Sequence, residues 1–118
     1  MKTWKAAVIC MGLGMAGCES GPSESDKATG LAKAYVARNF KDPDSVMFRD
    51  LKVILENGKP NYVCGEANAK NGFGAYVGYE KFYGTVEGSG ASMSVKFMIL
   101  QSQAERSGGV FFFPYQCK

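Results

Sequence analysis

The 118-residue chain has no histidine, one tryptophan and four cysteines. Histidine is the commonest general base near neutral pH and the commonest metal ligand, so its absence excludes Ser–His and Cys–His nucleophile pairs. The acidic residues are scattered and the cysteines widely spaced, so we expect neither a metal site nor a cofactor. The glycine-rich stretches at Gly72–Gly74 and Gly88–Gly90 lack a Walker or dinucleotide-binding pattern, and we interpret them as hairpin turns.

The chain also lacks an apolar run long enough to cross a membrane. The uncharged stretch from Ala6 to Gly17 has 12 residues, whereas a spanning helix needs roughly 20. Lys2 and Lys5 precede this stretch, and a basic segment followed by a short apolar one is typical of an export signal. We therefore predict a signal peptide over residues 1–17.

The signal ends in Met15-Ala16-Gly17-Cys18, which resembles the lipobox of bacterial lipoproteins. The resemblance implies that Cys18 is acylated, with palmitate among three acyl chains that hold the mature chain to a membrane. Since Glu19 rather than Asp follows the cysteine, the sorting rule of such lipoproteins implies the outer membrane, facing the periplasm. The alternative is an ordinary signal cleaved near Ala16, which leaves an odd number of cysteines in an oxidising compartment.

Processing changes the charge of the chain. The formal charge of the whole sequence is +3, but residues 18–118 carry 12 basic and 11 acidic side chains. No basic block or basic stripe interleaved with aromatic residues remains, so nucleic acid is not an expected partner.

Hydrophobic periodicity indicates a single α+β domain over residues 26–118, joined to the acylated cysteine by a flexible tether over residues 18–25. We predict one amphipathic helix, capped by Ser25 or Asp26, packed on an antiparallel sheet of four to five strands. The helix would be followed by a short turn at Asp42–Ser45. Strands are predicted over residues 47–56, 62–69, 75–85, 92–100 and 110–117, the last at an edge because of Pro114. The Asn57-Gly58 pair predicts a hairpin, with a loop lengthened by Lys59-Pro60.

Cys64 and Cys117 are the natural disulfide pair of an exported domain this small. Cys10 would leave with the signal and Cys18 would be acylated, so an even pair remains. The disulfide would tie the last predicted strand to the second.

The segment from Cys64 to Tyr79, CGEANAKNGFGAYVGY, carries most of the candidate chemistry. Together with the upstream stretch from Asp42 to Arg49, it resembles a segment of small, functionally uncharacterised lipoproteins of Gram-negative bacteria and their prophages. The resemblance implies localisation and general build, but no reaction or ligand. The candidate binding residues are Glu66, Asn68, Lys70, Asn71 and Tyr76.

Two interpretations of these residues stay open. Glu66 could be an acid or base whose pKa Lys70 lowers, as in a small cell-wall-active enzyme. Alternatively, the residues form an exposed strand face with a cross-strand ion pair, followed by a turn that needs glycine at positive φ. The missing histidine and the excess of aromatic residues lead us to expect a non-enzymatic binding domain anchored in the envelope, whose partner is a protein or a glycan. Exclusion of competing phage and inhibition of a wall hydrolase are alternatives within the same class.

Overall fold

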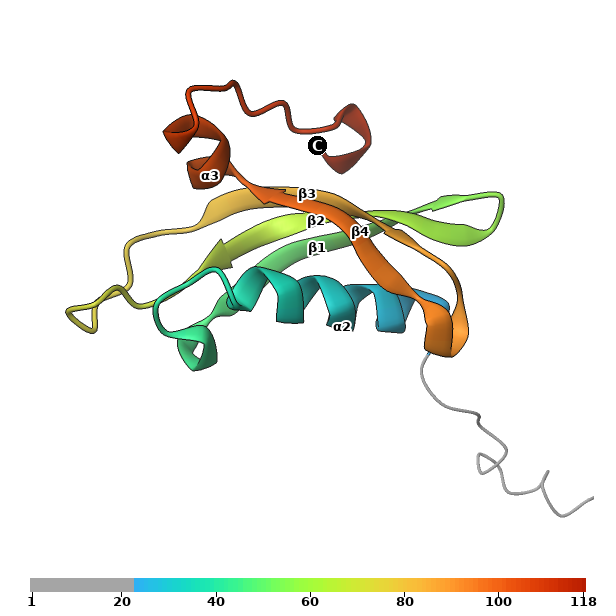
Figure 1. The fold of residues 1–118 in the computed structure, drawn as a ribbon, viewed down its shortest axis with the longest axis horizontal. Helices are drawn as coiled ribbons and strands as arrows, with labels where there is room; N and C mark the ends of the chain where they lie inside the picture. Colours follow the sequence, from blue (N-terminus) through green and yellow to red (C-terminus); the bar gives the residue numbers. More distant parts are fainter. Residues whose placement is uncertain (1–22) are drawn as a thin grey trace, which may run out of the picture.

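One helix lies along one face of a four-stranded antiparallel sheet in the computed structural model, which describes residues 23–118 (Figure 1). The strands follow the order β1-β2-β3-β4, so each pairs with its neighbour in the sequence. A disulfide joins Cys64 to Cys117. The predicted α+β class and disulfide are thus confirmed. The predicted signal peptide, the acylation site at Cys18 and residues 18–22 of the predicted tether lie outside the described residues.

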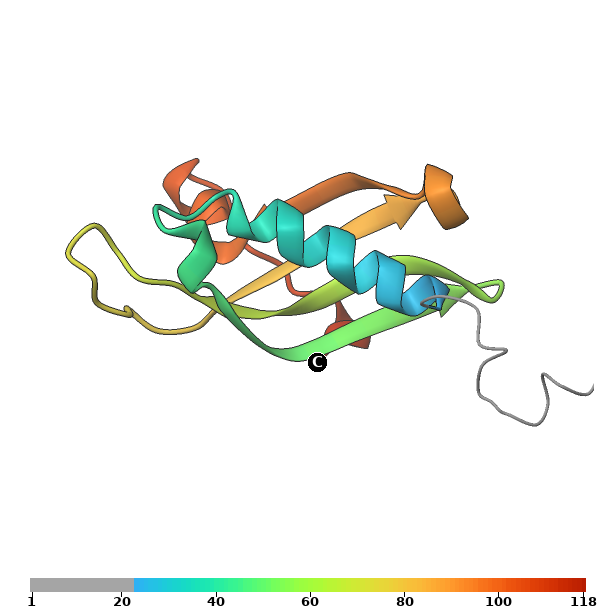
Figure 2. The same cartoon turned by 90° about the horizontal axis from the view of Figure 1, so that it is seen from below.

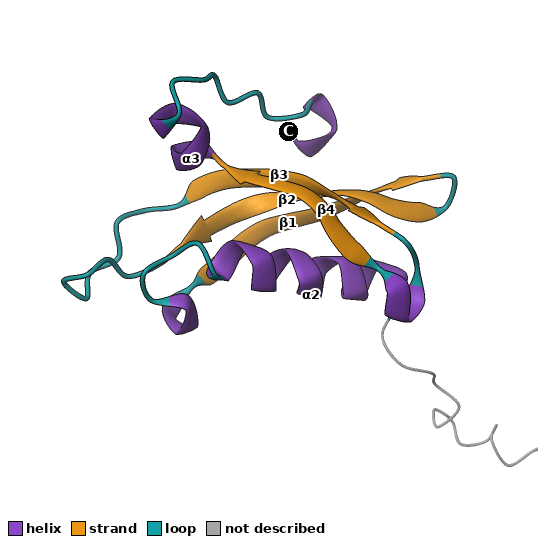
Figure 3. Cartoon of the chain, in the orientation of Figure 1, coloured by secondary structure: helices purple, strands orange, loops and turns teal. Residues whose placement is uncertain are grey.

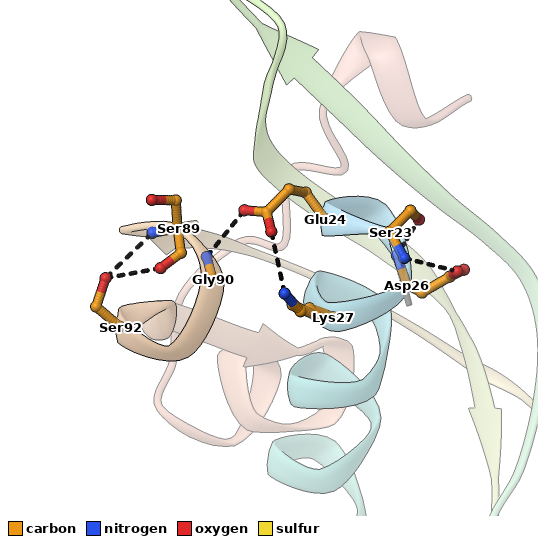
Figure 4. A network of polar contacts seen from close by, with 7 residues as sticks. All are labelled: Ser23, Glu24, Asp26, Lys27, Ser89, Gly90 and Ser92. Carbon is orange, nitrogen blue, oxygen red and sulfur yellow. Dashed lines mark hydrogen bonds and ion pairs between the residues drawn. The ribbon is translucent and has the colours of Figure 1, made fainter. Parts of the chain in front are cut away.

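Helix α2 (Glu24–Ala37) begins two residues before the predicted start at Asp26. Its cap is Ser23, not Ser25 or Asp26, because Ser23 and Asp26 form a reciprocal capping box (Figure 4). The amide of Asp26 donates to Ser23 Oγ at 3.1 Å, and the amide of Ser23 donates to Asp26 Oδ2 at 3.3 Å. Both amides would otherwise lack a partner at the helix start.

The first turn of α2 is also bound to the loop between β3 and β4, which contains the short helical turn η2 (Gly90–Ser92). Glu24 Oε1 accepts a hydrogen bond of 3.0 Å from the amide of Gly90, and Glu24 Oε2 lies 3.3 Å from Lys27 Nζ (Figure 4). The bond from Gly90, with Lys27 beside it, lowers the pKa of the Glu24 carboxyl below its ordinary value.

The helix crosses the sheet obliquely and buries one apolar stripe against it (Figure 2). Ala28, Ala32 and Val36 have no exposed surface, and they pack in one cluster with residues from three strands. The small alanines bring the helix close to the sheet, where Phe82 is the largest fully buried side chain. The helical stripe predicted from sequence is therefore the stripe that forms the core.

Strands β1 (Met47–Glu56) and β2 (Lys59–Asn68) form the first hairpin, preceded by the turn η1 (Pro43–Ser45). Asn57 and Gly58 both have positive φ, and Glu56 pairs directly with Lys59. The loop is therefore a two-residue turn, and the predicted longer loop is wrong. The ladder instead accommodates Pro60 through an irregularity between Ile54 and Leu55.

A bulge in β1 changes which side chains face the helix. Arg49 pairs with Glu66 and Lys52 pairs with Cys64, so Asp50 and Leu51 together oppose Gly65, with Asp50 at φ 55°. Because one extra residue reverses the alternation, the buried set becomes Phe48, Leu51 and Val53. Met47 and Leu55, which the predicted pattern placed inside, are exposed.

Strand β3 (Glu80–Glu87) begins five residues after the predicted start at Ala75, and β4 (Ser94–Leu100) covers most of its predicted range. Gly84 pairs with Val63 of β2 and Met98 of β4, and a Cβ there would lie 2.1 Å from the carbonyl oxygen of Phe97. A second irregularity, at Lys96 in β4, separates Val95 on the helix face from Phe97 and Ile99 on the opposite face.

The chain after β4 crosses to the face of the sheet opposite α2 (Figures 1 and 3). It forms the short helix α3 (Gln101–Arg106) and then an irregular segment, residues 107–118, which ends in the turn η3 (Tyr115–Cys117) and which we call the strap. The predicted fifth strand over residues 110–117 is wrong. The rings of Phe111 and Phe113 pack at steep angles against Tyr83 on the sheet face, so this segment does not pair at an edge, and Pro114 cannot donate to a ladder. No helix within residues 23–118 has the length and hydropathy to span a bilayer.

Candidate functional site

The strap is fixed to the sheet at two points. Near its middle, the rings of Phe111 and Phe113 lie 5.5 and 6.5 Å from the ring of Tyr83 in β3, centroid to centroid, and stack on each other at 6.0 Å. Near its end, Cys117 is bonded to the buried Cys64 of β2. Between these points the strap stands over β1, β2 and β3.

A cavity of about 470 Å³ lies between the strap and the three strands. Its lining combines an apolar part, formed by Cys117 of the disulfide and by Phe113, with a charged part. Leu51 also borders the cavity, but its side chain packs on the helix face of the sheet. The charged residues that line it are Asp50, Lys52, Glu66, Lys81 and Lys118. A hollow in which charged groups converge beside an apolar surface can hold a small ligand and fix its orientation.

Glu66 lines this cavity with 20% of its side chain exposed. Its Oε1 accepts a hydrogen bond of 2.6 Å from Arg49 Nε on the neighbouring strand, and the Arg49 guanidinium stacks on the ring of Tyr79 at 3.8 Å. The hydrogen bond from Arg49 to Glu66 raises the pKa of the Arg49 guanidinium above its already high ordinary value. The predicted pairing of Glu66 with Lys70 is wrong, because Lys70 lies beyond the end of β2, where its ammonium rests over the Tyr76 ring at 5.8 Å.

Lysines line the cavity from three different segments. Lys52 Nζ of β1 donates to the main-chain carbonyl oxygens of Gln116 and Lys118, at 3.4 and 3.2 Å, and so joins the sheet to the strap. Lys81 Nζ of β3 lies 5.4 Å from the centroid of the Phe113 ring. Within residues 23–118, none of Lys52, Lys81 and Lys118 forms an ion pair with a carboxylate.

The other predicted site residues build the loop between β2 and β3, at the opposite end of the molecule from the start of α2 (Figures 1 and 2). Asn68 is buried and its Oδ1 accepts from the amide of Gly78 at 3.0 Å. Asn71 Oδ1 accepts from the amides of Phe73 and Ala75, which closes the tip of the loop. The Tyr76 hydroxyl donates to the carbonyl oxygen of Ser45 at 2.8 Å.

These bonds hold the backbone of the loop in one shape. Asn68, Asn71 and Tyr76 therefore hold the backbone of this loop, and no hydrogen bond within residues 23–118 joins them to Glu66. Lys70 meets Tyr76, but it does so away from the cavity. Of the five candidate residues, only Glu66 lines the cavity beneath the strap.

The aromatic excess noted in the sequence serves both faces of the sheet. Phe48 and Phe82 contact each other on the helix face, whereas Tyr83, Phe97, Phe111 and Phe113 cluster on the strap face. Phe73, Phe112 and Tyr115 remain exposed, the first on the β2–β3 loop and the other two on the strap.

Sequence reasoning missed Arg49, Lys52, Lys81, Phe113 and Lys118 as residues of the site. One signal could have found the strap residues, because a Cys64–Cys117 disulfide brings residues next to Cys117 beside those next to Cys64. The site residues of β1 and β3 can be predicted only if the strand register is known. Alternation of apolar and polar residues does not give the register of β1, because the bulge at Asp50 interrupts it.

No group of three or more cysteine and carboxylate side chains able to hold a metal ion occurs within residues 23–118.

The comparisons with known proteins give no relative on which to base an assignment. No protein-family model, curated protein or solved structure matches the chain.

Proposed function

We propose that this chain is a non-enzymatic binding protein of a bacterial cell envelope, held to a membrane by acyl chains on Cys18. Its ligand would enter the cavity between the strap and the sheet. The observation that carries the proposal is the cavity itself, which is walled by a covalently fixed segment and lined by charged side chains from both sides. A disulfide in so small a domain also fits an exported protein.

The contacts around Glu66 favour binding over catalysis. Arg49 occupies one oxygen of the carboxylate at 2.6 Å and is itself held against Tyr79. A general acid or base must offer an oxygen to the substrate, and the guanidinium leaves only the second oxygen of this carboxylate for it. Lys52 is likewise engaged, with two carbonyl oxygens of the strap.

The position of α2 sets how close the domain would lie to the membrane. Six residue steps separate Cys18 from Glu24, where the helix starts. At about 3.5 Å per residue, the start of the helix would stand at most roughly 20 Å from an acylated Cys18. The same end of the domain carries η2 and the β1–β2 turn, while the β2–β3 loop points to the far end (Figure 1).

Metabolic labelling tests the anchor. The chain would be expressed in a Gram-negative host with labelled palmitate, beside the variants Cys18→Ala and Cys10→Ala. We expect label in the wild type and in Cys10→Ala, and none in Cys18→Ala. Equal labelling of Cys18→Ala would contradict the lipidation site.

Photo-crosslinking in the envelope tests the binding role. A photoreactive phenylalanine would replace Tyr115, which is exposed on the strap beside the cavity, or Leu55, which is exposed near the β1–β2 turn and serves as the matched control. We expect an adduct of defined mass from position 115 and little from position 55. Adducts of equal amount and pattern at the two positions would count against a site at the strap.

A second candidate function is a wall-active enzyme that uses Glu66, and it is favoured by the location of Glu66 in the cavity wall. It predicts that purified protein releases soluble fragments from isolated cell wall and that Glu66→Gln abolishes this release. A binding protein releases nothing with either residue. The same preparations, assayed in parallel, therefore separate the two functions.

A further inference from the structure

We infer that the cavity beneath the strap takes an organic anion, in which a carboxylate or phosphate group is joined to an apolar group. The inference rests on the proposed role of this cavity as the ligand site, and it adds the chemical class of the ligand. It follows from the way the charges around the cavity are paired and from the apolar part of its wall.

The two acidic residues of the wall are both directed to one cation. Glu66 Oε1 lies 2.6 Å and Asp50 Oδ2 lies 3.9 Å from Arg49 Nε. The guanidinium therefore balances one of these two negative charges, and it stands beside the cavity without being part of its lining.

The three lysines of the wall have no such compensation within residues 23–118. Lys52 contacts main-chain oxygens of the strap and Lys81 contacts an aromatic ring, and no side-chain carboxylate within residues 23–118 pairs with either ammonium group. The lining thus carries three ammonium groups against two side-chain carboxylates, and a ligand with negative charge would be attracted by each ammonium group that it approaches.

The sheet places two of these lysines on either side of β2. Lys52 pairs with Cys64 from β1, and Lys81 pairs with Glu66 from β3, so all four side chains point to the strap face. Adjacent strands are about 4.8 Å apart, which separates the β1 and β3 backbones by roughly 10 Å. Two lysine side chains rooted at that separation can both reach an oxyanion placed between them.

The apolar part of the wall defines the rest of the ligand. Phe113 and Cys117, which closes the disulfide with Cys64, supply this apolar surface from the strap. A bare inorganic anion would leave these surfaces in contact with water, whereas an aromatic or aliphatic group would cover them. The cavity therefore favours an anion with an apolar body.

Titration by nuclear magnetic resonance tests the inference on the chain purified in a neutral detergent. The probes are benzoate, phenyl phosphate and the uncharged benzamide, each followed through the backbone amide signals. We expect both anions to shift the signals of Lys52, Gly65, Lys81 and Lys118, and benzamide to shift them far less. The tighter of the two anions then identifies carboxylate or phosphate as the natural group.

Variants show whether the lysines of the wall are responsible. The double variant Lys52→Gln/Lys81→Gln should weaken benzoate binding roughly tenfold, since two attractive charges are removed. Lys118→Gln, which leaves the bonds of Lys52 to the strap in place, provides a milder loss in a protein that keeps its fold. Lys33→Gln/Lys96→Gln, at lysines that do not line the cavity, should leave binding unchanged.

Salt provides an independent reading, because an increase from 20 to 300 mM sodium chloride shortens the screening length and should weaken the anions but not benzamide. Equal binding of benzamide and benzoate, or an equal loss in the Lys33/Lys96 control, would overturn the inference. Photo-adducts at Tyr115 without anion binding would leave the proposed function standing and remove only this assignment of the ligand.

Discussion

The disulfide is the contact whose removal has the most calculable effect on stability. Cys64 and Cys117 are 53 positions apart, so the bond closes a loop of 54 residues. In the chain-entropy model, closing a loop of that length stabilises the folded state by about 4 kcal/mol, because the unfolded chain loses conformations. A domain of this size has a total stability of about 5–15 kcal/mol, so the loss is a large fraction.

The double variant Cys64→Ala/Cys117→Ala should therefore unfold at a much lower urea concentration than the wild type. With a slope of about 1.5 kcal/mol per molar urea, a loss of about 4 kcal/mol moves the midpoint by roughly 2.5–3 M. Far-UV circular dichroism is the suitable signal, since the single tryptophan, Trp4, lies within the predicted signal peptide. The wild type and the double variant would each be measured with and without a thiol reductant.

Reductant supplies the control. It should bring the wild type to the midpoint of the double variant and leave the double variant unchanged. A difference of less than about 1 kcal/mol between the two proteins would refute the reasoning. It would mean that the aromatic contacts of the strap with Tyr83 restrict the chain as much as the covalent bond does.

Three further predictions concern the helix, the sheet and the loop that joins them. Gly30→Ala should raise the free energy of unfolding by about 0.5–1 kcal/mol, because Gly30 lies inside α2 with open space at its Cβ position. Gly84→Ala should lower the free energy of unfolding by about 3 kcal/mol or more, because its Cβ would clash with the neighbouring strand. Urea unfolding of the two variants tests these opposite signs. Phe82→Ala, at a fully buried ring, should cost about 3–5 kcal/mol in the same assay, and a cost below 1 kcal/mol would contradict the assigned core. The Glu24 carboxyl has its pKa lowered by the hydrogen bond from Gly90, so its stabilisation is present above the ordinary value of 4.5 and disappears as the pH falls through the lower folded value. Thermal melts between pH 2 and 7 should accordingly show Glu24→Gln below the wild type at neutral pH and converging with it in acid; a constant gap would indicate a role independent of charge.

Local signals in the sequence predicted much of the fold. The helical stripe of α2, the first strand and the Asn57-Gly58 turn each depend on residues close together in the chain, and all three are present. The disulfide followed from counting cysteines. These features require no knowledge of which strand lies beside which.

The errors come from contacts between distant residues. The bulge at Asp50 and the irregularity at Lys96 shift the alternation of β1 and β4, and no period of two survives them. The strap reads as a strand because it is aromatic and follows a turn, but its rings find partners on the face of β3 rather than at an edge. The residue pattern of one segment does not show whether that segment packs on a sheet face or pairs at a sheet edge.

The candidate site was only partly predictable for the same reason. Glu66, a candidate from the sequence, lies in the wall of the cavity. The enzymatic interpretation placed its partner four residues along the chain, at Lys70, and the alternative expected a cross-strand ion pair without naming the partner. The partner is Arg49, 17 residues before Glu66 on the adjacent strand. Strand register, which sets such pairs, depends on the bulge.

The two close approaches in the sheet also bear on how this gene can diverge. A Cβ at Gly65 would lie 2.8 Å from the Leu51 side chain, and one at Gly84 would lie 2.1 Å from a main-chain oxygen that no neighbouring substitution can remove. A folded protein can tolerate another large apolar side chain in place of Phe82, but no residue other than glycine fits at position 84. Descendants of a common ancestor are therefore expected to keep the Cys64-Gly65 pair and the glycine of β3 after most other positions have changed. That sparse set of fixed positions would reveal kinship where overall identity no longer does.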